Sequence, residues 1–144
     1  EKALLFIDLD DYQNVYQAHG HLVGDAYLKR SAEAISESIR SGDVVSRFSG
    51  NQFVVVLDSN DLTLAETVAR RIIKAVGNVI PEFEGISVGV TKIIPGITQQ
   101  AVLVNADTAL YRSKRSHLVG ISIVDPANPR IEPELWPETD MTPQ

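Results

Sequence analysis

Two carboxylates close an apolar stretch near the start of the chain. In ALLFIDLDD, residues 3–11, Asp8 and Asp10 lie on either side of Leu9. Because side chains alternate along a strand, both carboxylates are expected on the same face of it. Paired carboxylates at the end of a strand suit Mg²⁺, which prefers hard oxygen ligands. A strand end followed by a helix N-cap explains the same residues equally well.

A hairpin turn with little charge is the second candidate. The stretch SGNQF, residues 49–53, joins two apolar runs at 44–48 and 52–57, which have the spacing of a β-hairpin. Its polar side chains are a serine hydroxyl and the amides of Asn51 and Gln52. The pattern therefore predicts a well-defined turn whose side chains carry no ionised group.

Four further charged residues could recognise a nucleotide. Arg40 and Asp43 bracket a Ser-Gly pair; an arginine fork can bind a guanine edge or a phosphate, and a carboxylate can accept from guanine N–H groups. Asp25 could accept the same donors, and Lys114 could meet a phosphate. Taken singly, each is better explained by structure: a helix end, a turn, a helix start or a solvated helix face.

The order of the elements indicates how these residues are held. Apolar periodicity and turn signals predict the order β-α-β-β-α-β-α-β, which is that of an α/β fold of the α+β two-layer kind with a mixed sheet. A capping-box pattern, Thr63 with Glu66, predicts the start of the second helix. The apolar run at 52–57 predicts a central strand covered on both faces. The expected strands are residues 3–11, 44–48, 52–57, 85–93 and 119–124, and the expected helices are 21–40, the segment from 63 onwards and 98–116.

Composition limits the class of protein. The 144 residues are 44% hydrophobic, enough for the core of one domain, and the absence of cysteine excludes disulfides and thiolate metal sites. The apolar runs are too short to cross a membrane, and no basic stripe suggests nucleic-acid binding. With no signal peptide visible and Glu1 in first place, we expect a piece of a longer cytoplasmic chain without membrane contact.

The end of the chain differs in composition from the rest. Residues 125–144 hold five of the seven prolines, and five acids face one arginine there, a net charge of −4. An acidic, proline-rich segment is typical of a linker or an extended docking segment. We therefore expect a domain that spans residues 1–124 and a tail, 125–144, that lies outside its core.

Taken in order, four stretches of the chain resemble the GGDEF domain of diguanylate cyclases. They are FIDLDDYQNVYQAHGHLVGDAYL, RSGDVVSRFSGNQFVVVL, ISVGV and ADTALYRSK. The resemblance runs from residue 3 to about residue 124, and the helix that usually leads the family has no counterpart. It implies a GGDEF-like fold with a mostly antiparallel central sheet flanked by helices. It also implies a bacterial signalling domain. Active members of the family dimerise and, with two Mg²⁺ ions, join two GTP molecules into cyclic di-GMP.

The signature turn departs from the family pattern. In the resemblance, Ser49 and Gly50 take the places of two glycines, Asn51 that of the metal-binding acid and Gln52 that of the next acid. Asn51 offers a neutral carbonyl where a carboxylate is usual, so the Mg²⁺ site is expected to be lost or weak and no cofactor is expected. Ser49 adds a Cβ where the backbone of the family approaches the nucleotide.

Other positions of the family's GTP site are partly kept. Asp8, Asp25 and Lys114 match positions for metal, guanine and phosphate, which together with the turn makes a vestigial GTP site. Tyr16 replaces an asparagine that reads guanine, and Leu118 falls where a phosphate-binding arginine is usual. Because metal-assisted phosphoryl transfer depends on charge neutralisation and positioning, these changes lead us to expect a domain that is not an enzyme and has no catalytic residue.

A second site of the family is better preserved. Many members carry an inhibitory product site, R-x-x-D, ahead of the signature turn, and Arg40 and Asp43 stand at that offset. Arg71 matches a second arginine that completes the site in relatives. The resemblance therefore implies that cyclic di-GMP binds at Arg40, Asp43 and Arg71.

These features together predict a regulatory module of cyclic di-GMP signalling, which binds cyclic di-GMP and acts on other domains of its own chain. A homodimer is a further expectation. Two alternatives stay open. One is an interaction module that binds no nucleotide and regulates a neighbouring domain, for instance an EAL phosphodiesterase. The other is an allosteric GTP-binding domain that uses Asp8, Asp25 and Lys114; residual cyclase activity is expected least.

Overall fold

A mixed sheet of five strands forms the centre of the domain. The computed structural model describes residues 1–10, 12–79, 85–115 and 120–127. The strand order is β2-β3-β1-β4-β5, in which β4 and β5 are parallel and every other pair is antiparallel. The predicted fold class, with its mostly antiparallel sheet, is therefore confirmed. The strands are β1 (Lys2–Leu9), β2 (Val44–Ser49), β3 (Gln52–Leu57), β4 (Ile86–Ile93) and β5 (Ile121–Val124), and the helices are α1 (Tyr12–Glu37), α2 (Leu62–Gly77) and α3 (Gln99–Arg115).

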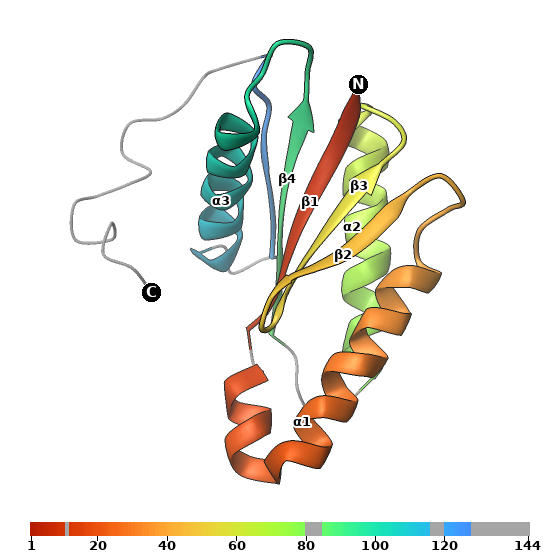
Figure 1. Cartoon of the computed structure of the whole chain (residues 1–144), viewed down its shortest axis with the longest axis vertical. Helices are drawn as coiled ribbons and strands as arrows, with labels where there is room; N and C mark the ends of the chain where they lie inside the picture. Colours follow the sequence, from red (N-terminus) through yellow and green to blue (C-terminus); the bar gives the residue numbers. More distant parts are fainter. Residues whose placement is uncertain (11, 80–84, 116–119, 128–144) are drawn as a thin grey trace, which may run out of the picture.

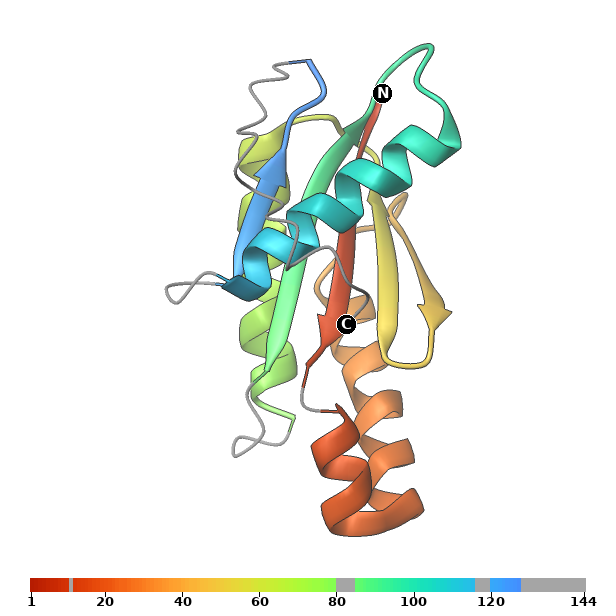
Figure 2. The ribbon, with the colours of Figure 1, turned by 90° about the vertical axis from the view of Figure 1, so that its left-hand side faces the viewer.

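Helices cover both faces of the sheet (Figures 1 and 2). Because side chains alternate along β1, Leu5 and Ile7 face α1 and α2, whereas Leu4 and Phe6 face α3. The larger apolar cluster lies under α1 and α2 and the smaller one under α3. At its carboxyl end β1 therefore presents Asp8 and Asp10 to the side of α3, whereas Leu9 between them faces α1 and α2.

The most buried strand is β1, and the expectation that residues 52–57 form a central strand covered on both faces is wrong. β3 lies second from the edge, and its residues alternate between buried and half-buried positions. The reason is the position of α3, which packs against β4, β5 and β1. Val54 and Val56 therefore face the side of the sheet that α3 covers incompletely. An apolar run does not distinguish this environment from full burial.

Two helix starts differ from the sequence prediction. α1 begins at Tyr12 rather than at residue 21, and it bends at Gly20, whose φ of 84° is a left-handed conformation that favours glycine. The N-cap of α2 is Asp61, whose carboxylate accepts from the main-chain N–H groups of Thr63 and Leu64. Asp61 satisfies the free N–H groups of the first turn, so Thr63 lies inside the helix instead of capping it.

The predicted tail, residues 125–144, follows the last strand in the sequence. β5 ends at Val124, and the described part of the chain ends at residue 127. The predicted division at residues 124 and 125 concerns a tail that lies mostly outside the described residues, so it stays a prediction. In the ranges that the structure describes, no helix is both long and apolar enough to cross a membrane.

Candidate functional site

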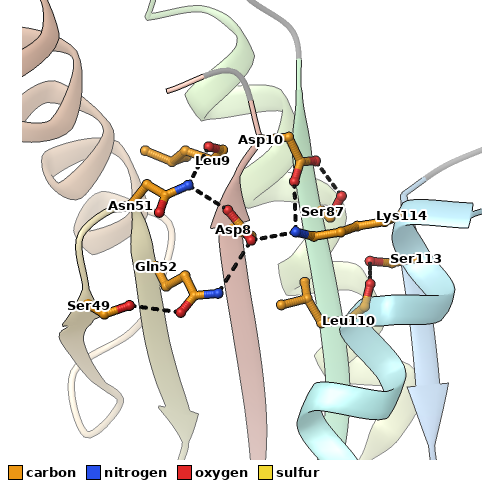
Figure 3. A network of polar contacts seen from close by, with 10 residues as sticks. All are labelled: Asp8, Leu9, Asp10, Ser49, Asn51, Gln52, Ser87, Leu110, Ser113 and Lys114. Atoms are coloured by element: carbon orange, nitrogen blue, oxygen red, sulfur yellow. Dashed lines mark hydrogen bonds and ion pairs between the residues drawn. The ribbon is translucent and has the colours of Figure 1, made fainter. Parts of the chain in front are cut away.

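A polar network joins the end of β1 to the hairpin turn and to α3 (Figure 3). Asp8 is at its centre and is only 4% exposed. Its Oδ1 accepts from Asn51 Nδ2 at 2.8 Å, and its Oδ2 accepts from Lys114 Nζ at 2.6 Å. Gln52 Nε2 makes a longer contact with the same Oδ2, at 3.4 Å. The carboxylate is thus surrounded by donors from two separate segments, the hairpin and α3.

Strand register brings these distant residues together. Asp8 pairs with Gln52 of β3 on one side and with Ser87 of β4 on the other. Lys114 lies in the last turn of α3, on the face of the sheet toward which Asp8 points. Antiparallel pairing thus brings Asn51, 43 positions away, into contact with Asp8, and the packing of α3 on the sheet brings Lys114, 106 positions away.

Lys114 bridges two carboxylates. Its ammonium lies 2.6 Å from Asp8 Oδ2 and 3.4 Å from Asp10 Oδ1. Burial lowers the pKa of Lys114, but the hydrogen bond and the charge of Asp8, together with Asp10, outweigh burial and raise this pKa above its ordinary value. Burial raises the pKa of Asp10, against the hydrogen bond from Ser87 and the charge of Lys114. The two carboxylates and the ammonium thus carry a net charge of about −1 when all are ionised.

The oxygens at this end of β1 do not fit the Mg²⁺ that the family implies. Asn51 Nδ2 donates to Asp8 Oδ1 and, at 2.9 Å, to the carbonyl of Leu9. A carboxylate and a carbonyl only accept hydrogen bonds, so it is the NH₂ of the amide that faces both. The described residues contain no group of three or more His, Cys, Asp or Glu side chains placed to hold a metal ion.

A cavity lies on the opposite face of the sheet, between α1 and the hairpin. Its volume is about 360 Å³. Asp25 and Lys29 of α1 and Arg47 of β2 supply its charges, and the rest of its lining is mostly apolar. Two residues of the expected GTP site thus lie on different faces of the sheet. Asp25 lines this cavity, whereas Asp8 points to the α3 side.

The three residues expected to bind cyclic di-GMP lie around the end of α1. Arg71 of α2 donates from Nη1 to the carbonyl of Ser38 at 3.0 Å, two positions before Arg40. Arg40 is exposed. The hydrogen bond from Lys2 is the main cause that lowers the pKa of Asp58, and the charge of Arg40 adds to the effect. The Asp43 carboxylate accepts from the main-chain N–H groups of Arg40, at 2.9 Å, and Asp58, at 2.8 Å. Asp43 therefore shapes the turn that presents Arg40.

The turn itself is unstrained. Ser49 Oγ donates to Gln52 Oε1 at 2.8 Å, and a Cβ at Gly50 would meet no atom within 4 Å. None of the described non-glycine residues has a positive φ, so Ser49 does not need the glycine conformation. Tyr16 packs against Gly24, where a Cβ would come within 3.0 Å of its ring. Leu118 lies outside the described residues.

Sequence reasoning missed two cations of the cavity. Lys29 follows Asp25 by four residues on α1, a spacing that places both on one helix face and could have indicated a shared site. Arg47 was read only as part of the hairpin; its Nε donates to the carbonyl of Gly50 at 2.9 Å and so also fixes the turn.

The model of the family "Diguanylate cyclase, GGDEF domain" matches residues 1–118. The bifunctional diguanylate cyclase/cyclic di-GMP phosphodiesterase MucR of Pseudomonas aeruginosa is 33% identical over 119 residues, which cover 78% of this chain and 17% of MucR. Diguanylate cyclase A of Treponema denticola is 31% identical over 122 residues, 79% of this chain and 33% of the relative. The chain thus spans a third or less of the length of these two relatives.

Solved structures agree with the family. An EAL/GGDEF domain protein from M. capsulatus is similar with a TM-score of 0.73 and 32% identity, over 85% of this chain and 83% of that one. The GGDEF domain of DgcB from Caulobacter crescentus, solved in complex with cyclic di-GMP, has a TM-score of 0.75 over 85% of this chain and 77% of that one. Its identity of 22% shows the shared fold alone. This chain belongs to the GGDEF family, whose matched relatives are bacterial proteins of cyclic di-GMP signalling.

The expectation that the domain is not an enzyme is wrong. The matching family is that of diguanylate cyclases, and relatives 31–35% identical to the chain are named diguanylate cyclases. The expectation relied on the replaced acids of the signature turn, Asn51 above all, and on the changes at Tyr16 and Leu118. The charge of one turn does not decide activity, because phosphoryl transfer depends on several groups together, and Asp8 and Lys114 are in contact at this place.

Proposed function

We propose that this GGDEF domain binds cyclic di-GMP at the surface formed by Arg40, Asp43 and Arg71. One contact carries the assignment: Arg71 Nη1 lies 3.0 Å from the carbonyl of Ser38, so the α2 arginine stands beside the end of α1. Two guanidinium groups from separate elements are thereby presented on one surface. Asp43 accepts from two main-chain N–H groups and fixes the turn between them.

The chemistry of these groups suits a cyclic dinucleotide. A guanidinium has five N–H donors in one plane, which match a phosphate or the acceptor edge of guanine in pairs. Arg71 spends one donor on Ser38, and its remaining nitrogens are available to a ligand. In the described part of the chain, the Arg40 guanidinium has no hydrogen-bond partner. The relative solved with cyclic di-GMP belongs to the same fold, and MucR is named for both synthesis and hydrolysis of this nucleotide.

Arg71→Ala is expected to weaken binding of cyclic di-GMP by about tenfold or more, because a hydrogen bond to a charged group is worth about 1.5–3 kcal/mol. The matched control is Arg70→Ala. Arg70 precedes Arg71 on the same helix and pairs with Glu66 at 2.6 Å, so its loss removes the same charge away from the proposed surface. Isothermal titration calorimetry with cyclic di-GMP measures both variants, and thermal unfolding checks that both remain folded. Equal affinities of the two variants would contradict the assignment.

A second candidate function is binding of GTP in the cavity beside α1. The observation that favours it is the cavity itself, whose mostly apolar lining suits a purine and whose Asp25 carboxylate can accept from guanine N–H groups. The contact between Asp8 and Lys114 lies on the other face of the sheet, so Asp25 and not that pair would read the base.

Asp25→Ala is expected to weaken GTP binding by about tenfold or more, because the N–H donors of the guanine edge would lose the carboxylate that accepts from them. Asp107→Ala, the same change at an exposed position of α3, should leave GTP affinity within about twofold of the parent. ATP serves as a second comparison because adenine lacks the N1–H and N2–H₂ donors. Equal binding of GTP and ATP would exclude a guanine-reading role for Asp25.

A further inference from the structure

The amide of Asn51, in the hairpin turn, meets two oxygen atoms of β1, Asp8 Oδ1 and the carbonyl of Leu9 (Figure 3). We propose that Asn51 and Lys114 take the place of a divalent cation at the end of β1. The junction between β1 and the β2–β3 turn then forms without Mg²⁺ in the nucleotide-free domain, and its stability does not depend on Mg²⁺.

Asn51 closes a reciprocal pair with the last residue of β1. Its carbonyl accepts from Leu9 N at 3.0 Å, and its side-chain Nδ2 donates to the Leu9 carbonyl at 2.9 Å. The same Nδ2 donates to Asp8 Oδ1 at 2.8 Å. One NH₂ group thus satisfies a carbonyl and a carboxylate together, which is a task that a bound cation could also perform.

A carboxylate at position 51 could not make this arrangement. Aspartate has no proton to donate at neutral pH, so its oxygens would face the Asp8 carboxylate and the Leu9 carbonyl at hydrogen-bond distance. The repulsion would be relieved only by a positive group between them. The amide is therefore the side chain that allows the turn to close on β1 without a metal ion.

Lys114 supplies the positive charge. Its ammonium contacts Asp8 and Asp10, and the Asp8 side chain is only 6% exposed, whereas that of Lys114 is 37% exposed. The lysine therefore reaches in from the surface to neutralise a buried carboxylate. A divalent cation at the same place would have to displace this ammonium and turn the Asn51 amide around. The Leu9 carbonyl would then lose its donor.

Manganese binding provides a direct test, because free Mn²⁺ gives an electron paramagnetic resonance signal that is lost on binding. The nucleotide-free chain is expected to leave Mn²⁺ free up to about millimolar concentration. Asn51→Asp should bind Mn²⁺ at least about tenfold more tightly, because it adds a carboxylate and removes the amide donors. Asn105→Asp, the same change in the middle of α3, is the matched control and should behave as the parent.

Thermal unfolding gives a second readout that does not depend on manganese. The parent chain should unfold at the same temperature in EDTA and in millimolar Mg²⁺. Asn51→Asp should unfold at a lower temperature in EDTA and recover when Mg²⁺ is added. Should it fail to fold in either condition, Lys114→Met decides, since losing the internal cation should raise Mn²⁺ affinity by about tenfold. The proposal would be overturned if the parent bound Mn²⁺ at micromolar concentration. It would also be overturned if the Asn51→Asp and Lys114→Met variants responded to metal no more than the parent does.

Discussion

Replacement of Arg40 by alanine is expected to abolish micromolar binding of cyclic di-GMP. Arg40 is exposed at the turn that follows α1. The Asp43 carboxylate holds that turn, because it accepts a hydrogen bond from the main-chain N–H of Arg40. Losing a charged partner from a nucleotide site costs about 2–5 kcal/mol, which reduces affinity by more than tenfold and at the upper limit by several thousandfold. Arg40→Lys should cost nearly as much, because an ammonium cannot copy the planar pair of donors.

The measurement is calorimetric titration of cyclic di-GMP into the parent and the variants. Arg30→Ala removes the same charge from an exposed position of α1 and should bind as the parent does. Asn51→Ala should also change little, because the turn lies apart from the proposed surface. An unmutated chain that gives no heat with cyclic di-GMP would contradict the receptor function. An interaction module that regulates a neighbouring domain would then be the better account.

Gly89→Ala is expected to destabilise the domain by about 3 kcal/mol and to lower its unfolding temperature by roughly 10 °C. Gly89 lies in β4 where α3 crosses the strand. A Cβ there would lie 2.7 Å from the carbonyl oxygen of Ala106 and 2.8 Å from the Cα of Leu110, and it would also meet Leu110 N. These are main-chain atoms of α3, so the whole helix would have to move away from the sheet.

Gly77→Ala is the matched control for this change. Gly77 ends α2, and a Cβ there would meet no atom within 4 Å. Alanine loses less backbone entropy than glycine in a helix, so a gain of up to about 1 kcal/mol is expected. Thermal and urea unfolding of both variants measure the difference. A Gly89→Ala variant as stable as the parent would show that α3 can shift without cost, and Lys114, at the end of α3, would then be less firmly placed.

The sequence predicted the order and type of every element, because local periodicity and turn signals are properties of neighbouring residues. The hairpin at SGNQF is an example: two apolar runs separated by a short polar stretch leave few other structures for β2 and β3. Boundaries were less certain. The helix was expected to begin at residue 21 instead of Tyr12, although Tyr12, Val15 and Tyr16 in its first turns have the i, i+3, i+4 spacing of a helix face.

The sequence also identified the residues that meet at the end of β1, since Asp8, Asn51, Gln52 and Lys114 were all selected from it. What each of them contacts was decided by tertiary structure. Strand register alone sets Gln52 opposite Asp8, and the direction of an amide depends on the acceptors that surround it. Only the fold places the carbonyl of Leu9 beside Asn51.

The tertiary structure likewise decided on which face of the sheet Asp8 and Asp25 lie. The family resemblance implies one GTP site that includes Asp8 and Asp25. Alternation along β1 turns Asp8 toward α3, and Asp25 of α1 lines the cavity on the other face. Local sequence determined which elements form and which side chains carry charge. The packing of helices on opposite faces of one sheet determined which of those charges can act together, because contacts between segments tens of residues apart depend on the fold as a whole.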